Sequence, residues 1–418
     1  MSTAATAVDF DIAIVGGGIV GLAFARLLAA GLEQVGNPCR IALLEVQPPE
    51  TVAQDADIDL RVSAIAPASR AILQNMGVWD QLPVARVSPY ERMCVWQAEG
   101  TAGGAKSISF DAAEFGEAWL GHIVENRAMR LAAWKKVEGA TSVKVISGLK
   151  PVSLSEATDH CCITLEDSSS LHARLVVGAD SSRSWVREQL GVSFREHLYE
   201  QSAIVAHIAS ERPHAATAWQ RFLPGGPVAL LPLADGRSSL VWSCPDTQAK
   251  ELLEMDGTDF NVELAAALDH VLGSLECTTQ RVSFPLGSGH AARYTGRRFA
   301  LIGDAAHRVH PLAGQGVNLG LLDAAVLAEE LVAHFALPAA DPGDPLVLRR
   351  YERARKGDTM LTLGAMDAIN HLFAGPCGGI GGLGLGVVDK LPLVKARFAA
   401  YAMGRGRSLP AAARLIDP

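Results

Sequence analysis

The sequence lacks the features that mark several classes of protein. It has no excess of basic residues, since 37 Lys and Arg stand against 45 Asp and Glu, a formal net charge of -8. A nucleic-acid-binding protein neutralises phosphates with clustered Lys and Arg, so this balance argues against that class. The seven cysteines include no C-x-x-C pair, which fits free thiols in a reducing compartment better than a disulfide framework.

Long uncharged apolar runs are also missing. An apolar stretch begins at Ile12, but Asp9 and Asp11 precede it where a signal peptide needs positive charge, and Arg26 interrupts its continuation. We therefore expect a cytoplasmic protein that contacts the inner face of a membrane at most peripherally. Only 6% of the residues are aromatic, so an apolar substrate tunnel would have mainly aliphatic walls.

The chain has the size and composition of a folded enzyme. Its 418 residues, 49% of them hydrophobic, suffice for two domains with a sizeable core. His307 and His310 stand close enough to share a metal, but no third or fourth ligand with fitting spacing follows them. We expect no metal site. The two histidines should instead hydrogen-bond loop carbonyls, with one of them at the rim of a substrate cavity.

A glycine-rich turn near the N-terminus gives the first nucleotide signal. After a predicted strand, Gly16, Gly18 and Gly21 follow with G-x-G-x-x-G spacing and lead into a predicted helix. These glycines suit, in turn, a tight turn, the close approach of a pyrophosphate and helix-to-strand packing, while the helix N-terminus faces the phosphates. A second strand ends at Glu45, where a carboxylate can accept hydrogen bonds from both hydroxyls of an adenosine ribose. These elements predict a dinucleotide site.

A second signal lies in the rear third of the chain. A short apolar strand precedes Gly303, Asp304 and a glycine-rich helix start that runs to Asn318. A carboxylate at a strand end can accept hydrogen bonds from two hydroxyls of a polyol, although Asp also commonly caps a helix. Gly314 and Gly316 would let the backbone approach a flavin ring closely, or would serve tight helix packing. Two signals so far apart suggest one large cofactor held at both ends.

A third block lies between these two. An apolar strand leads into Gly178, Ala179, Asp180 and Ser181. The three blocks, in this order, resemble the class A flavin-dependent aromatic hydroxylases of the para-hydroxybenzoate hydroxylase fold, in which the Asp of the middle block is usually followed by Gly. Ser181 departs from that pattern. A serine is less favourable than glycine there if the turn needs a positive φ.

The resemblance implies an α/β fold, with a Rossmann-like FAD-binding domain interleaved with a β-sheet substrate domain and followed by C-terminal helices. We expect the FAD-binding domain to comprise residues 1–75, 119–187 and 280–345, the substrate domain residues 76–118 and 188–279, and the C-terminal helical segment residues 346–418. Alternating apolar residues predict the strands of a sheet that roofs the cofactor, at residues 93–97, 163–165, 203–207 and 239–242.

The resemblance also implies roles for single residues. Asp304 would bind the ribityl hydroxyls of FAD, Asp180 would lie near the pyrophosphate, and Pro311 would face the flavin where oxygen reacts. Arg61 would pass beside the isoalloxazine, and Arg127 would offer a guanidinium to the pyrophosphate. The candidate catalytic residues are Pro311, Gly314, Gly316 and His310. The candidate cofactor-binding residues are Gly16, Gly18, Gly21, Glu45, Arg61, Arg127, Asp180, Gly303, Asp304, Gly316, Val317 and Asn318.

Several apolar and basic side chains have two interpretations. Trp219, Phe222 and Trp242 would form sheet core, or one of them would line the substrate cavity. Arg183 and Arg187 would pair with phosphate oxygens or with surface carboxylates. A helical stripe would dock on the body of the protein or ease substrate entry, and its residues are Met360, Leu363, Met366, Ile369 and Leu372. The glycine-rich residues 375–386 have no assigned role.

Finer likeness narrows the family. Residues 60–65, 77–80, 120–126 and 310–320 look like the ubiquinone-biosynthesis hydroxylases. This implies an FAD-dependent monooxygenase that uses NAD(P)H and dioxygen to hydroxylate the ring of a polyprenyl-phenol, and that could associate with other proteins of the pathway. Residues 60–65 and 120–126 favour the C5 hydroxylase over the C6 enzyme, which residues 219–222 resemble nearly as well.

Two other functions remain open. The same fold could serve a prenyl reductase or another aromatic hydroxylase, whereas a halogenase is disfavoured because the seven tryptophans form no W-x-W motif. Turnover of NAD(P)H without dioxygen would favour the reductase. A different class is a non-catalytic flavin-binding scaffold in a lipid-biosynthesis complex. That role would gain support if an Asp304 variant unable to bind FAD rescued cells that lack the gene.

Overall fold

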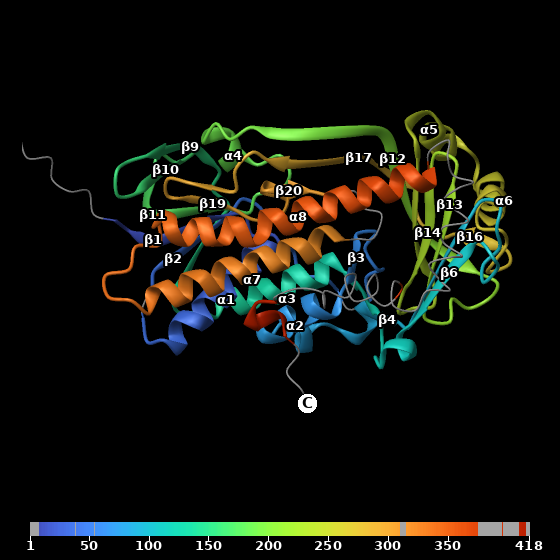
Figure 1. Cartoon of the computed structure of the whole chain (residues 1–418), viewed down its shortest axis with the longest axis horizontal. Coiled ribbons are helices and arrows are strands. Elements are labelled where there is room, and N and C mark those ends of the chain that lie inside the picture. The colour runs from blue at the N-terminus through green and yellow to red at the C-terminus, as the bar shows by residue number, and fades with distance from the viewer. Residues whose placement is uncertain are drawn as a thin grey trace, which may run out of the picture.

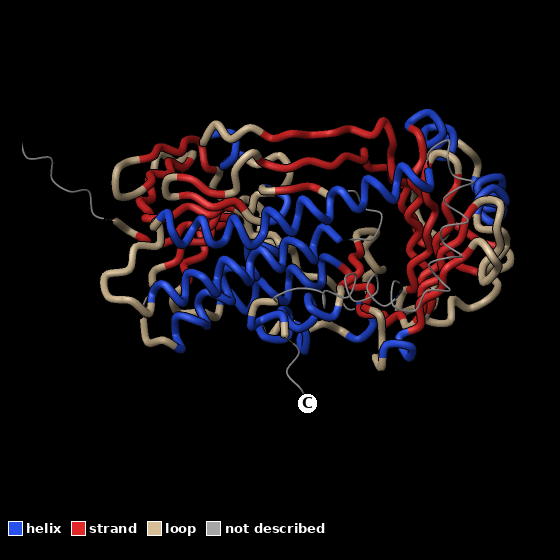
Figure 2. Tube along the Cα trace, in the orientation of Figure 1, coloured by secondary structure: helices blue, strands red, loops and turns tan. Residues whose placement is uncertain are grey.

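The structure is a computed structural model, which describes residues 8–37, 39–53, 55–309, 315–374, 395 and 409–414. In these ranges, one sheet of eight strands and one of nine dominate the molecule (Figures 1 and 2). Two long strands of the nine-stranded sheet, β12 (Phe194–Ser210) and β17 (Val282–Ala291), extend along one edge of the molecule toward the eight-stranded sheet (Figure 1). The fold is α/β, as expected.

The first sheet holds the amino-terminal strand at its centre. Its parallel neighbours are β2 and β11 on either side of β1, with β8 beyond β2 and β19 beyond β11. Ile12 and Ile14 are fully buried, as expected for the central strand of a parallel sheet. The strands of this sheet are β1 (Phe10–Val15), β2 (Ile41–Glu45), β8 (Val143–Ser147), β9 (Pro151–Glu156), β10 (Cys161–Leu165), β11 (Ser170–Gly178), β18 (Thr295–Gly296) and β19 (Phe299–Leu301).

Helices α1, α3, α7 and α8 pack in a layer beside this sheet, with α7 between α1 and α8 (Figure 1). Proline opens both α2 and α8, in agreement with its preference for the first helical position. The helices of the described chain are α1 (Ile19–Gln34), α2 (Pro67–Asn75), α3 (Asn126–Glu138), α4 (Trp185–Gln189), α5 (Asp246–Glu254), α6 (Gly257–Ala267), α7 (Gln315–Phe335) and α8 (Pro345–Ala374).

The second sheet, which we call the roof sheet, is covered on its outer face by α5 and α6 (Figure 1). Its strand order is β20-β17-β12-β15-β14-β13-β5-β6, with β16 paired to β12. The strands are β5 (Arg92–Gln97), β6 (Ser107–Asp111), β12 (Phe194–Ser210), β13 (Thr217–Leu223), β14 (Gly226–Pro232), β15 (Ser238–Pro245), β16 (Leu275–Cys277), β17 (Val282–Ala291) and β20 (His307–Arg308).

One predicted roof strand belongs elsewhere. Residues 163–165 lie in β10, which pairs with β9 and β11 of the first sheet, so their assignment to the roof was wrong. Alternation of apolar residues signals a half-buried strand but carries no information about which sheet the strand joins. The predicted strands at 93–97, 203–207 and 239–242 do lie in the roof sheet.

A small third sheet lies between the two large ones. It consists of β3 (Val62–Ile65), β7 (Gly121–Glu125) and β4 (Val87–Tyr90), all antiparallel. Two of the segments singled out in the sequence, residues 60–65 and 120–126, therefore pair directly with each other.

Candidate functional site

The amino-terminal turn has the geometry that its glycines predict. Gly16 has φ of +110°, and an added Cβ would lie 2.4 Å from the carbonyl oxygen of Ala179. At Gly21 an added Cβ would lie 2.0 Å from the carbonyl oxygen of Gly16, so only glycine lets α1 pack this closely on the turn. Gly18 differs, since a Cβ there would meet nothing within 4 Å. That open side of the turn, at the N-terminus of α1, leaves room for a pyrophosphate.

Glu45 lies at the end of β2 and hydrogen-bonds the backbone of this turn. Its Oε2 accepts a hydrogen bond of 2.6 Å from the Gly17 N–H, and its Oε1 accepts one of 2.8 Å from the Gln47 N–H. Arg130, on α3, pairs with the same carboxylate at 3.4 Å and donates to the Gly17 carbonyl at 2.9 Å. Arg130 thus holds both the glycine turn and its acidic partner, a role that the sequence pattern did not reveal.

The middle block turns sharply after Asp180. Ser181 has φ of +72°, the left-handed conformation that a serine adopts at a cost. Asp180 accepts a hydrogen bond of 2.9 Å from the Val186 N–H through Oδ2, while its Oδ1 is buried without a partner. Burial raises the pKa of this carboxyl. Because the Asp180 Cα lies next to Gly16, the unpartnered oxygen stands beside the glycine turn.

Arg187 supports this block through backbone carbonyls. Its guanidinium donates to the carbonyls of Ser182 and Ala305, at 2.6 and 2.9 Å, and stacks over Phe194 at 4.1 Å. Among the described residues it forms no ion pair with a surface carboxylate, so that interpretation is not borne out. Arg187 therefore joins the Asp180 turn to the turn that carries Asp304.

The rear motif forms a short 3-10 turn at Gly303–Ala305 that precedes β20, and α7 begins only at Gln315. Gly303 needs its glycine, because its φ is +59°. Asp304 does not cap a helix, and among the described residues its side chain has no hydrogen-bond partner. The Asp304 side chain is accessible to solvent. The protein atoms around it nevertheless desolvate its carboxyl group, which raises the pKa. These properties together describe a carboxylate in an open recess.

A second carboxylate behind this turn is fully satisfied. Asp323, on α7, is completely buried and accepts hydrogen bonds from the Gly303 N–H at 2.9 Å, His307 Nε2 at 2.6 Å and Arg355 Nε at 2.7 Å. Burial alone would raise the pKa of Asp323, but His307 and Arg355 lower it. His307 thus bonds a carboxylate rather than the loop carbonyl we expected. No group of three or more metal-ligating side chains lies together in the described ranges.

The front and rear motifs touch each other. Val20 lies in the first turn of α1. A Cβ added to Gly303 would lie 3.1 Å from the Val20 side chain, and a Cβ added to Gly320 would lie 2.6 Å from it. Small residues on α7 and in the rear turn therefore let α1 approach closely. Two motifs almost three hundred residues apart in sequence are parts of one site.

The start of α7 adjoins this recess. An added Cβ on Gly316 would lie 4.0 Å from Asp304 Oδ1. Asn318 donates to the Ala64 carbonyl at 2.8 Å and accepts from the Ala66 N–H at 3.0 Å, which fastens α7 to the end of β3. Val317 packs against the core of the first sheet. The candidates His310, Pro311 and Gly314 lie outside the described residues.

Two candidate arginines lie on the roof side of the site. Arg127, in the first turn of α3, donates to Glu125 at 2.6 Å and to the Asp57 carbonyl at 2.7 Å. Glu125 is buried and also binds Arg86 at 3.1 Å. The Arg61 guanidinium lies 5.4 Å from the Phe284 ring of β17, and within the described residues it pairs with no carboxylate. Both arginines thus lie between α3 and the roof sheet.

The aromatic candidates lie on opposite faces of the roof sheet. Trp219 and Trp242 pack with α5 and α6 in the core behind the sheet. Phe222 belongs to a small cluster on the opposite face, the face that also presents Phe284 to Arg61. Of the three, only Phe222 lies on the side of the candidate site. In α8, Met360 is exposed and Leu363 buried, so these two do not share one stripe, and the other three side chains of the stripe are not described.

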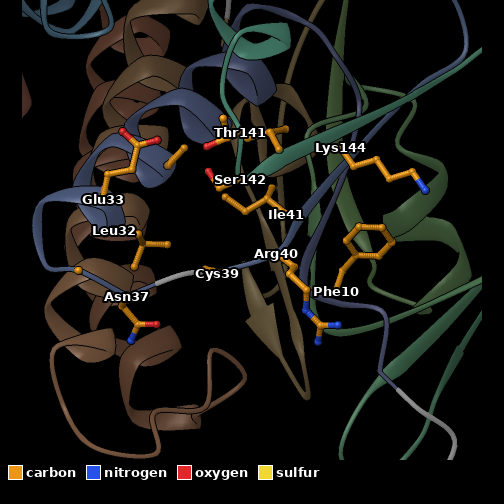
Figure 3. A pocket seen from close by; sticks show the side chains of 13 residues that line it. Phe10, Leu32, Glu33, Asn37, Cys39, Arg40, Ile41, Thr141, Ser142 and Lys144 are labelled. Atoms are coloured by element: carbon orange, nitrogen blue, oxygen red, sulfur yellow. The ribbon is translucent and has the colours of Figure 1, made fainter.

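A hollow of about 560 Å³ lies elsewhere, and Figure 3 shows its lining. It opens at Phe10, Ile41 and Val143, which begin three parallel strands of the first sheet. Open α/β sheets bind ligands at the carboxyl ends of their strands, where Gly16, Glu45 and Asp304 lie. The hollow is therefore not the candidate site, despite its size.

The geometry is that expected of a dinucleotide-binding site, and the family match indicates FAD. Residues 9–357 match the family described as FAD binding domain. Ubiquinone hydroxylase UbiL of Rhodospirillum rubrum is 36% identical over 409 residues, covering 97% of this chain and 92% of the relative. The 3-demethoxyubiquinol 3-hydroxylase of Escherichia coli is 34% identical over 397 residues, covering 94% and 98%. The human ubiquinone biosynthesis monooxygenase COQ6 is 36% identical over 417 residues, covering 89% and 87%.

The chain belongs to the FAD-dependent hydroxylases of ubiquinone biosynthesis, and it is a flavoprotein monooxygenase. Solved structures agree in fold. The p-nitrophenol 4-monooxygenase PnpA of Pseudomonas putida superposes with a TM-score of 0.75 at 17% identity, over 97% of this chain and all of that one. PqsL of Pseudomonas aeruginosa, in complex with 2-aminobenzoylacetate, gives 0.71 at 22% identity, over 87% and 96%. Across the described residues, no helix is both long and apolar enough to span a membrane.

Proposed function

We propose that this enzyme hydroxylates the aromatic ring of a polyprenyl-phenol intermediate of ubiquinone biosynthesis, with NAD(P)H as electron donor and dioxygen as oxygen source. The observation that carries the proposal is the exposed carboxylate of Asp304, which lies at the carboxyl ends of the parallel strands and has no hydrogen-bond partner among the described residues. This carboxylate lies near the start of α7 and would give the cofactor a polar anchor.

The residues present fit FAD at three separate points. The open side of Gly18 and the N-terminus of α1 would face the pyrophosphate, with the unpartnered Asp180 Oδ1 near it. Glu45 would accept hydrogen bonds from the adenosine ribose, and Asp304 from the ribityl chain. When bound, FAD supplies the electron transfer to dioxygen that a monooxygenase requires.

The remaining candidates would shape the surroundings of the ring. The first turn of α7, from Gly316 through Val317 to Asn318, would place helix N–H groups and their partial positive charge against negative charge on the cofactor. Asn318 would act through its bonds to the backbone of Ala64 and Ala66, which fix that turn in place. Arg61 and Arg127 would offer positive charge from the roof side. We keep Gly314, Pro311 and His310 as candidates for the ring face and the substrate rim.

We further propose C5 as the hydroxylated position. The two segments that favour C5 in the sequence form the β3–β7 pair, and Asn318 joins that pair to the start of α7. In the segment that resembles the C6 enzyme, Trp219 packs in the core behind the roof sheet and Phe222 lies on the side of the site. We favour C5 because both C5-like segments belong to the pair that is bonded to the start of α7.

The test is a deletion strain analysed by mass spectrometry of its quinone precursors. We expect a prenylated phenol without the C5 oxygen to accumulate, and wild-type protein to restore the oxygen from labelled dioxygen. Asp304→Asn should fail to restore it, whereas the exposed-surface control Asp269→Asn should succeed. Accumulation of a precursor that lacks only the C6 oxygen would overturn the assignment of position. Turnover of NAD(P)H with a prenyl substrate under anaerobic conditions would overturn the monooxygenase reaction itself.

We also propose that contact with the membrane is peripheral and involves the start of α8. Arg349, Arg350 and Arg353 are exposed there beside Leu346, which is 64% exposed. Basic side chains around an apolar one suit anionic lipid headgroups. Sedimentation with vesicles that contain anionic phospholipid should pull down wild-type protein more than Arg350→Ala/Arg353→Ala. Equal recovery of the two proteins would contradict the contact. The basic residues near the C-terminus lie mostly outside the described ranges.

A further inference from the structure

The loop between β2 and β3 is held by arginines from separate parts of the fold. Arg127, on α3, donates to the Asp57 carbonyl at 2.7 Å, and Arg86 donates to the carbonyl of Ala56. The carboxylate of the same Asp57 pairs with Arg237, which stands immediately before β15 of the roof sheet. Asp57 thus receives an arginine of α3 on its carbonyl and an arginine of the roof sheet on its carboxylate.

Arg237 is well placed to fix this loop. Its side chain is only 19% exposed, and it also bonds Asp235 at 2.7 Å and Thr278 at 3.3 Å, so its own position is set by the roof sheet. Asp57 is far more exposed, at 61%, and belongs to a loop without helix or strand. The more rigid partner is therefore the arginine, and the loop takes its position from it.

Arg127 depends on the same loop. Its guanidinium is shared between the Asp57 carbonyl and Glu125, and Glu125 is also held by Arg86. If the loop moved away, Arg127 would keep its bond to Glu125 but lose the second donor contact that fixes the plane of the guanidinium. The orientation of Arg127 is thus coupled to the position of the roof sheet.

We propose that Arg237 is a positioning residue, which acts through Asp57 to orient Arg127 toward the cofactor and so couples the substrate sheet to FAD binding. This proposal rests on the role proposed for Arg127 at the cofactor. It adds a residue of the roof sheet that needs no contact with FAD of its own.

The test measures FAD affinity of the purified apoprotein by flavin fluorescence, together with the visible spectrum of the bound flavin. Because a partly exposed ion pair contributes about 0.4–1 kcal/mol, Arg237→Met and Asp57→Asn should each weaken FAD binding about two- to fivefold and shift the flavin band. The double variant should bind FAD with the same affinity as the single variant that binds it more weakly, since both changes break the same contact. Arg237→Lys should recover most of the affinity.

Two further variants separate this proposal from the role of Arg127. Arg92→Met removes an exposed arginine of the same sheet whose guanidinium, among the described residues, bonds the Ala215 carbonyl alone, and it should leave both readouts unchanged. Arg127→Met should weaken FAD binding at least as much as Arg237→Met. If Arg127→Met weakens binding and Arg237→Met matches wild type, the coupling is refuted while the role of Arg127 stands. If Arg127→Met has no effect, both the role of Arg127 and the proposed route fail.

Discussion

Asp304 and Asp323 are neighbouring carboxylates with opposite surroundings. Asp323 is completely buried and accepts hydrogen bonds from three partners in three different elements. Asp304 is exposed in its recess, and the described residues offer it no hydrogen-bond partner. The pKa of Asp323 is lowered by His307 and Arg355 against the effect of burial, whereas partial burial raises the pKa of Asp304.

The difference separates structure from function. A buried charge that is fully paired stabilises a particular arrangement of chain segments and leaves nothing for a ligand. A carboxylate surrounded by protein but left unpaired destabilises the ligand-free fold slightly, and a hydroxylated ligand can recover that energy. Asp323 holds the rear turn together, and Asp304 is the group that the turn presents.

Removal of the buried carboxylate should have the largest effect. Asp323→Ala leaves Arg355 buried without its main partner, so we expect a loss of about 3–5 kcal/mol in the free energy of unfolding, measured by urea denaturation. Asp358 binds the other end of the same guanidinium at 2.8 Å but is more exposed. Asp358→Asn should therefore cost about 1 kcal/mol. Equal losses in the two variants would show that Asp323 is not the centre of the cluster.

Removal of the open carboxylate should affect the cofactor instead. Hydrogen bonds to a charged group contribute about 1.5–3 kcal/mol, so Asp304→Asn should weaken FAD binding by about 10- to 100-fold. The unfolding free energy of the apoprotein should not fall. Fluorescence titration with FAD measures the first effect, and urea denaturation the second. Asp269→Asn, on the far side of the roof sheet, should change neither quantity.

The pH dependence of stability should distinguish the two carboxylates further. The pKa of Asp304 is raised in the folded state, so its ionisation costs stability as the pH rises through its unfolded value of about 3.9 and its folded value. Asp304→Asn removes that cost. The variant should therefore gain stability over wild type as the pH rises from about 3.5 to neutrality, with little difference at the acid end. A difference that stays constant with pH would contradict the raised pKa.

Asp180 is intermediate between Asp323 and Asp304, because one of its oxygens is hydrogen-bonded and the other has no partner among the described residues. The smallest expected effect on stability concerns the next residue, Ser181. Ser181 has φ of +72°, a conformation that costs a non-glycine residue about 1–2 kcal/mol. Ser181→Gly should raise the free energy of unfolding by about 0.5–1 kcal/mol, because backbone entropy offsets part of the relief. Ser182→Gly, without a positive φ, should lower stability by a similar amount. A loss in both variants would mean that the turn is not strained.

The sequence predicted the parts of this site that depend on local pattern. Gly16, Gly18 and Gly21 follow a spacing dictated by one turn. The positive φ of Ser181 could be foreseen from the resemblance to a family in which Gly usually follows the Asp of the middle block. Glu45 lies at the end of its strand, as expected, but in the structure it bonds the Gly17 N–H.

The contacts that organise the site and that sequence reasoning missed are mainly long-range. Asp323 meets Gly303 and Arg355 across 20 and 32 residues, and Arg237 meets Asp57 across 180. No periodicity links such positions, because they come together only when separate elements pack. A carboxylate within an apolar run, as Asp323 is within residues 319–328 of α7, was the available signal. Alternation likewise could not say that Trp219 faces the outer core and Phe222 the site.

A crystal structure of the protein grown with FAD tests the central claim most directly. We expect the ribityl hydroxyls within hydrogen-bonding distance of Asp304, the pyrophosphate against Gly18, and Asp323 with its three protein partners unchanged. A flavin bound elsewhere, such as in the hollow at the amino ends of the strands, or an Asp304 that turns away from it, would contradict the account.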